Sequence, residues 1–202
     1  MSSRTERTTT ASASVGAGRR QRLDAQRNVL AIVEAAKTTF ATSGVDVPAK
    51  TITDLAGVGI GTLYRHFPRR SDLILAVVEH EIGHCIEAAD ELTARLEPRE
   101  ALIAWVNRFA DFVRTKHGLA NALHSGDPAY AGLAQTLLDR LEPVLDSLLE
   151  RAPLNARSRD TVSARDVLTT IALICQPVPG ETPSFNERMT EVFLEGLLVS
   201  RF

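Results

Sequence analysis

The chain has 202 residues, of which 44% are hydrophobic and 24% are charged, proportions typical of a globular protein with a substantial core. Its two cysteines, Cys85 and Cys175, are too few for a disulfide scaffold and favour a reducing compartment. No apolar run reaches the length of a membrane span and no apolar signal sequence begins the chain, so we expect a cytoplasmic protein without a membrane partner.

Charge is divided unevenly along the chain. Residues 1–70 hold 11 Lys/Arg against 5 Asp/Glu, whereas residues 71–202 hold 12 against 20. A basic front half is typical of a domain that contacts a polyanion, and it is also compatible with an ordinary solvated surface. Charge alone therefore leaves nucleic-acid binding open.

Residues 1–21 are predicted to form a disordered basic arm, because Ser, Thr, Ala, Gly and Arg give this segment almost nothing to bury. Its arginines could follow a DNA groove, or the arm could simply be solvated. From about Arg22 the pattern becomes helical and it ends at Gly44, a natural C-terminal breaker. The apolar residues that recur there at spacings of three and four are Val29, Ile32, Val33, Ala36 and Phe40.

Two short helices are predicted in residues 48–67. The first begins at Pro48 and ends at Gly57, and the second runs from Ile60 to Phe67. Helices this short bury little surface by themselves, so they must pack against the helix before them and the helix after them. One side of the second helix then stays free, as a helix-turn-helix that enters the major groove requires, while Leu63 and Phe67 face inward.

The rest of the pattern is also helical. A fourth helix is predicted from a Ser71 N-cap to about Asp90, and no segment shows the alternation of a strand. The sequence therefore predicts an all-α fold, with a helix-turn-helix domain at 22–82 and a larger helical domain at 83–202. The later helices are expected at about 98–117, 128–152, 163–176 and 184–201, with a polar linker at 153–161.

The segment from Ala56 to Leu73 has the sequence AGVGIGTLYRHFPRRSDL, which resembles the DNA-binding domain of tetracycline-repressor (TetR) type regulators. The resemblance extends over about Arg27 to Val78, with one departure at Thr53, where the family usually has a small Ala. It implies a homodimeric transcriptional regulator that binds double-stranded DNA at a palindromic operator. It also implies repression that a small-molecule ligand relieves.

The resemblance implies DNA-contacting roles for individual residues. Arg65 is the candidate for base readout, since Arg can bridge O6 and N7 of guanine, with a phosphate contact as the equal alternative. Lys50 aligns with a position that reaches bases or phosphates. The predicted DNA-binding residues are Lys50, Ile60, Gly61, Thr62, Tyr64, Arg65, His66 and Arg70.

The second domain is predicted to sense a ligand and to form the dimer. Trp105, Phe109 and Phe112, together with His117 and Leu123, could line a pocket for a small apolar or aromatic ligand, although an aromatic stripe at helical spacing is more often plain core. In the resembling family the terminal helices pair across a two-fold axis; the alternative is that they close the core of one chain. The predicted interface residues are Leu168, Ile171, Phe185, Met189, Val192, Phe193 and Gly196.

Other features of the sequence are compatible with different functions. The segment His80-Glu81-Ile82-Gly83-His84 matches the H-E-x-x-H pattern of zinc peptidases, so a zinc hydrolase is one alternative and a regulatory metal site another. The extended pattern is incomplete, because Glu87 replaces its Gly and Asp90 occupies the next ligand position. We therefore expect no enzyme, no cofactor and no metal. The third hypothesis is a helical scaffold that binds proteins through the Trp105 face.

Overall fold

The computed structural model describes residues 9–115 and 127–199. Within these ranges every regular element is a helix, and the one β-type pairing described is an isolated antiparallel bridge between Leu154 and Leu198. The predicted all-α fold is confirmed. No helix in the described part of the chain is long and apolar enough to cross a membrane.

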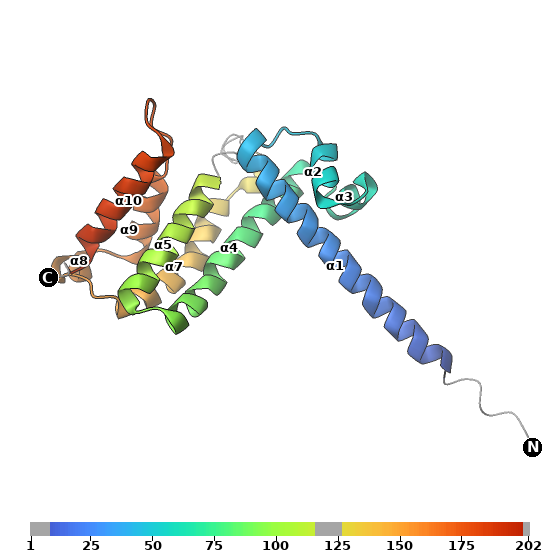
Figure 1. The fold of residues 1–202 in the computed structure, drawn as a ribbon, viewed down its shortest axis with the longest axis horizontal. Helices are drawn as coiled ribbons and strands as arrows, with labels where there is room; N and C mark the ends of the chain where they lie inside the picture. The colour runs from blue at the N-terminus through green and yellow to red at the C-terminus, as the bar shows by residue number, and fades with distance from the viewer. Residues whose placement is uncertain (1–8, 116–126, 200–202) are drawn as a thin grey trace, which may run out of the picture.

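A long first helix leads into a small helix-turn-helix unit beside a larger bundle (Figure 1). Helix α1 (Thr9–Ser43) packs against α2 (Ala49–Ala56), α3 (Ile60–His66) and α4 (Arg70–Arg95). Helix α4 continues into the bundle, where it packs on α5 (Pro98–Thr115) and α7 (Leu133–Arg151). Helix α9 (Ala164–Ile174) packs on α5, α7 and α10 (Pro183–Leu197). Helix α4 thus belongs to both parts of the molecule.

Helix α1 begins earlier than the sequence predicts. It starts at Thr9, whereas residues 1–21 were expected to form a disordered arm; residues 1–8 lie outside the described residues. The segment contains Ala and Arg, which are strong helix formers, and no proline, so a helix nucleated further along can extend through it. Ile32, Ala36 and Phe40 are fully buried on the packed face, and Gly44 ends the helix with a φ of 74°.

The helix-turn-helix is formed by α2 and α3, as predicted. Gly57 ends α2 in the left-handed conformation, at a φ of 67°, which a residue with a Cβ adopts only at a cost. Leu63 and Phe67 are buried, which confirms their inward orientation. Thr53 is also buried, and its hydroxyl donates to the carbonyl of Lys50 at 3.0 Å. The bulkier residue at this position is therefore accommodated without an unsatisfied polar group.

The start of α4 differs from the sequence prediction. Its N-cap is Arg69, not Ser71, and Ser71 is buried inside the first turn. Asp72 accepts a hydrogen bond from the backbone N–H of Arg69 at 2.9 Å, as the acidic half of a capping box does. The helix also continues past Asp90 to Arg95.

The later helices deviate at two places. A 3₁₀ turn, η2 (Pro128–Tyr130), precedes α7, which keeps Pro143 in its interior. The predicted polar linker contains a short helix, α8 (Ala156–Thr161), because the side chain of Asn155 accepts from the backbone N–H of Ser158 at 2.8 Å and caps its first turn.

Candidate nucleic-acid interface

Helix α3 is anchored on one side and exposed on the other. Leu63 lies in the core that α1, α2 and α3 share, whereas Ile60 and Tyr64 are 49% and 53% exposed. Arg65 and Gly61 are exposed as well, and Thr62 and His66 are half-buried. The structure therefore brings six of the predicted DNA-binding residues onto one short helix with a free face.

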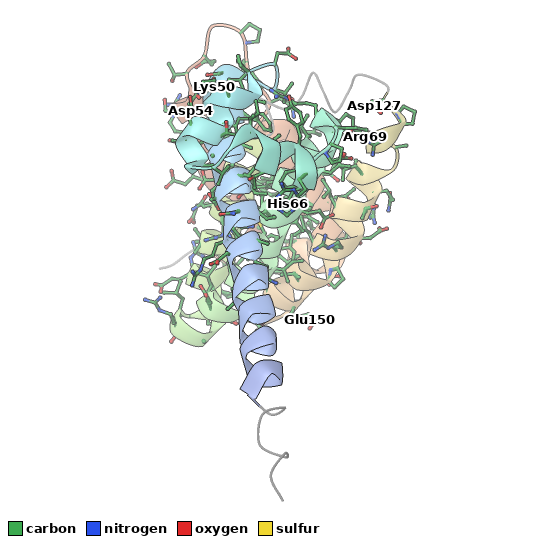
Figure 2. The ribbon with its side chains drawn as sticks, turned by 90° about the vertical axis from the view of Figure 1, so that its right-hand side faces the viewer. Lys50, Asp54, His66, Arg69, Asp127 and Glu150 are labelled. Carbon is green, nitrogen blue, oxygen red and sulfur yellow. The ribbon has the colours of Figure 1, made fainter. Side chains whose placement is uncertain are left out.

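Lys50 lies on α2, in the same unit. It forms an exposed ion pair with Asp54, with 2.8 Å between Lys50 Nζ and Asp54 Oδ1. Figure 2 places these two residues together at one side of the helix-turn-helix, while Arg69 lies near Asp127 at the other. An exposed pair of this kind is weak, so a DNA phosphate can compete with Asp54 for the ammonium group.

Arg70 is placed differently from the other predicted contacts. Its guanidinium donates from Nη2 to the carbonyl oxygens of Val45 and Val47 and lies 5.3 Å from the centre of the Phe40 ring. Burial lowers the pKa of Arg70 from its ordinary value. In this structure Arg70 ties the loop between α1 and α2 to the start of α4, so it positions the helix-turn-helix from within.

The exposed arginine at this position is Arg69, which was not among the predicted DNA-binding residues. Its Nη2 lies 2.7 Å from Asp72 Oδ1, and its side chain is 72% exposed. Hydrogen bonding to Asp72 raises the pKa of Arg69, and the same hydrogen bonds lower the pKa of Asp72. The segment Pro68-Arg69-Arg70 contains two adjacent arginines, and nothing in the local sequence indicates which of their side chains turns toward the core.

The predicted pocket aromatics lie in the core. Trp105 is fully buried, its Nε1 donates to the carbonyl of Cys85 at 2.7 Å, and its ring stacks on Phe109 at 5.9 Å between centroids. Because Trp105 is buried, it offers no surface to a protein partner. The hypothesis of a scaffold that binds proteins through the Trp105 face is therefore wrong. Phe112 borders a cleft of about 270 Å³ lined chiefly by charged residues. His117 and Leu123 lie outside the described residues.

A larger cleft, of about 650 Å³, lies between α5 and α10. Its lining is mostly polar and charged, including Arg114, Arg188 and Glu191. These two clefts therefore differ in their lining from the apolar or aromatic pocket expected from the sequence. Trp105 faces α4 instead, since its indole donates to the carbonyl of Cys85 on that helix.

The predicted dimer residues divide into two groups. Leu168 and Ile171 are fully buried within the single chain, so their expected role at a dimer interface is corrected to one in the monomer core. Val192 is 64% exposed, and Phe185, Met189 and Phe193 are half-buried on α10. Gly196 is exposed. Leu173 on α9, which the sequence did not single out, is 67% exposed.

Two family models match the chain. Residues 32–77 match the model described as bacterial regulatory proteins of the tetR family, and residues 97–199, half of the chain, match the C-terminal domain of SbtR-like transcriptional regulators. The chain belongs to the TetR family. This membership confirms the predicted DNA-binding transcriptional regulator and does not favour the zinc hydrolase or the scaffold.

Solved structures of other transcriptional regulators resemble this TetR-family protein over most of its length. The regulator SCO0520 of Streptomyces coelicolor is 31% identical, with a TM-score of 0.70 over 86% of this chain and 99% of its own. A regulator from Mycobacterium vanbaalenii is 30% identical, with a TM-score of 0.67 over 89% of this chain and 99% of its own. FadR of Bacillus subtilis, solved in complex with stearoyl-CoA, shares the fold at 19% identity and a TM-score of 0.54 over 83% of this chain and 98% of its own.

A curated relative matches a shorter region. An HTH-type transcriptional regulator of Staphylococcus aureus is 31% identical over 93 residues, which are 44% of this chain. The match spans 50% of that relative's length.

Proposed function

We propose that this TetR-family protein is a cytoplasmic, homodimeric repressor that binds a palindromic operator through α3 and is released by a small-molecule ligand. The proposal rests on the observation that one side of α3 is buried and the other is exposed. Leu63 anchors it from within, while Ile60 and Tyr64 leave half of their surfaces in solvent. Large exposed side chains on a short, firmly packed helix fit major-groove contact better than they fit a solvated surface.

The individual contacts follow from the exposure of each side chain. We assign base readout to Arg65, and phosphate contacts to Lys50, Thr62, Tyr64 and His66. Phosphate contacts fix the orientation of a protein on the duplex, whereas base contacts select its sequence. Ile60 and Gly61 allow the start of α3 to approach the groove closely. Arg70 is assigned a positioning role in place of the predicted phosphate contact. We assign that phosphate contact to its exposed neighbour, Arg69.

The dimer is proposed to form through the outer faces of α9 and α10. Leu173 and Val192 are the most exposed of the large apolar side chains identified in the described chain, at 67% and 64%. Exposed apolar side chains on adjacent helices are typical of an interaction surface. A two-fold axis there would present two α3 helices to half-sites about 34–36 Å apart or a multiple of that distance.

Release by a ligand requires a difference in affinity between two states of the protein. A ligand shifts the equilibrium only if it binds the state that cannot bind DNA more tightly. The stearoyl-CoA complex of FadR shows that a protein of this fold can hold a small molecule. For this chain the charged cleft between α5 and α10 is a polar alternative to the apolar ligand expected from the aromatic residues.

The test is selection of duplexes from a random DNA pool by the wild type and by Tyr64→Ala, over a series of salt concentrations. We expect the wild type to enrich a palindrome, the variant to lose the enrichment, and binding to weaken steeply with salt. Arg157→Ala, an exposed substitution on α8, serves as a control that should select the same palindrome. Absence of enrichment by folded wild type, or enrichment of a single unpaired half-site, contradicts a dimeric operator-binding protein.

A further inference from the structure

Three side chains with metal-binding chemistry meet where α1 crosses α4. His80 and His84 lie four residues apart on α4, and their ring centroids are 4.1 Å apart. Glu34 comes from α1, and its Oε1 lies 2.6 Å from His80 Nε2. One ligand atom from each of the three residues lies within 4.8 Å of the others.

We propose that Glu34, His80 and His84 form a binding site for a divalent transition-metal ion such as Zn²⁺, and that the ion joins α1 to α4. Two imidazoles and a carboxylate are a common protein donor set for Zn²⁺, with metal–ligand distances of about 2.0–2.2 Å. Ligand atoms of a tetrahedral ion are therefore about 3.4 Å apart. The observed separations run from 2.6 Å, between Glu34 Oε1 and His80 Nε2, to at most 4.8 Å, so binding would require rotations of these side chains.

The three side chains have room for such rotations and are open to solvent. The side chain of Glu34 is 50% exposed, that of His84 35% and that of His80 18%. His84 also borders the cleft of about 270 Å³. An ion can therefore enter from solvent, and water can complete its coordination.

The contact between Glu34 and His80 also suits a cation, because their Oε1 and Nε2 atoms lie 2.6 Å apart with room for only a proton between them. On binding, the ion would take the place of the proton shared between His80 Nε2 and Glu34 Oε1, and that proton would leave to solvent. Metal binding to imidazole requires this deprotonated nitrogen.

Glu81 distinguishes this site from that of a zinc peptidase. Its residue is only 8% exposed, and its Oε1 lies 2.7 Å from Lys37 Nζ and 3.9 Å from His84 Nδ1. A buried carboxylate paired with Lys37 in this way is not free to act as the general base of a peptidase. The carboxylates of Glu34 and Glu81 are both negative, and Lys37 carries one positive charge. The three groups therefore leave one negative charge, which favours a divalent cation.

The position of the site gives it a mechanical consequence. Helix α1 packs on α2 and α3, whereas α4 also packs on α5 and α7. An ion held by both helices would fix the angle between the helix-turn-helix and the bundle behind it. The third ligand is Glu34 on α1, which lies 46 residues before His80 in the chain. It is not Asp90, which occupies the next ligand position of the peptidase pattern.

The experiment is titration of the full chain, freed of metal by a chelator, with Zn²⁺ by calorimetry and with Co²⁺ by visible absorption. We expect one ion per chain for the wild type. Affinity should fall at least about tenfold in Glu34→Gln and in His84→Ala, because removing a ligand costs no less than removing its supporting partner. Glu91→Gln, an exposed carboxylate two turns further along α4, should bind like the wild type. Circular dichroism checks that each variant is folded.

Each contrary outcome overturns a stated part of the proposal. No saturable binding by the folded wild type removes the site. Wild-type affinity in Glu34→Gln, with loss in His84→Ala, shows an ion held by α4 alone and removes the link to α1. Equal affinity in all variants places the ion elsewhere in the chain. None of these measurements uses DNA, so their outcome is independent of the operator-binding proposal.

Discussion

The guanidinium of Arg70 hydrogen-bonds to the backbone carbonyl of Val45, a residue 25 positions earlier in the chain. This contact fastens the loop that leads into α2 to the first turn of α4. The two ends of the helix-turn-helix are thereby held together by a single side chain. The position of α3 in the molecule depends on this link as well as on the apolar core beneath it.

Replacing Arg70 with Met should destabilise the protein, because the methylenes remain but the carbonyls of Val45 and Val47 lose their donor. Hydrogen bonds that involve a charged group contribute about 1.5–3 kcal/mol, so we expect a loss of roughly that size in the free energy of unfolding, measured by urea denaturation. Arg157→Met, which removes an exposed arginine on α8, should change stability little. Equal losses in both variants would contradict the positioning role of Arg70.

Arg65→Ala should reduce operator affinity without reducing stability. If Arg65 contacts guanine, the loss is about 1–3 kcal/mol and discrimination at one base pair relaxes. Fluorescence anisotropy with the selected operator and with single-base variants measures both effects. Arg157→Ala removes the same charge far from α3 and should bind like the wild type. A loss that is uniform over all operator variants would indicate a phosphate contact instead.

The capping box at Arg69 and Asp72 should make stability depend on pH in the acid range. Hydrogen bonds from Arg69 lower the pKa of Asp72 in the folded protein. Asp72 thus contributes stability above the ordinary pKa of an aspartate, about 3.9, and this contribution is lost as the pH falls through the lowered folded-state pKa. Asp72→Asn should be less stable than the wild type at neutral pH, and the difference should disappear in acid.

Urea denaturation at several pH values measures this difference for Asp72→Asn. The matched control is Asp160→Asn, an exposed aspartate on α8. It should show no comparable pH-dependent difference from the wild type. A difference for Asp72→Asn that persists unchanged below the lowered pKa would show that the carboxylate charge is not the source of the effect.

Val192→Asp should separate the dimer. Like charges placed opposite each other across a two-fold axis cost several kcal/mol, so the dimer dissociation constant should rise at least about tenfold. Sedimentation velocity over a range of concentrations measures it. Leu96→Asp changes an exposed leucine that follows α4, outside α9 and α10, and should leave the dimer intact. A Val192→Asp protein that dimerises like the wild type would exclude the outer face of α10 as the interface.

The sequence by itself determined the helices and the helix-turn-helix. Periodic apolar residues, Gly57 at a left-handed turn and the inward pair Leu63 and Phe67 are local signals, because each depends on neighbours within one or two helical turns. The resemblance to TetR-type regulators in residues 56–73 also lies in one ungapped block, because it too depends on residues that are close in the sequence. The DNA-binding function could be predicted from this segment alone.

The tertiary structure alone decided which partner each side chain meets. Periodicity shows that Leu168 and Ile171 are buried, but not whether a second chain or their own chain buries them. Arg69 and Arg70 are adjacent and chemically identical, and only the position of the 45–47 loop turns Arg70 inward. Glu34 joins His80 only because α1 packs across α4. Such contacts depend on how helices distant in the chain pack, and that information is spread over the whole core rather than held in a local pattern.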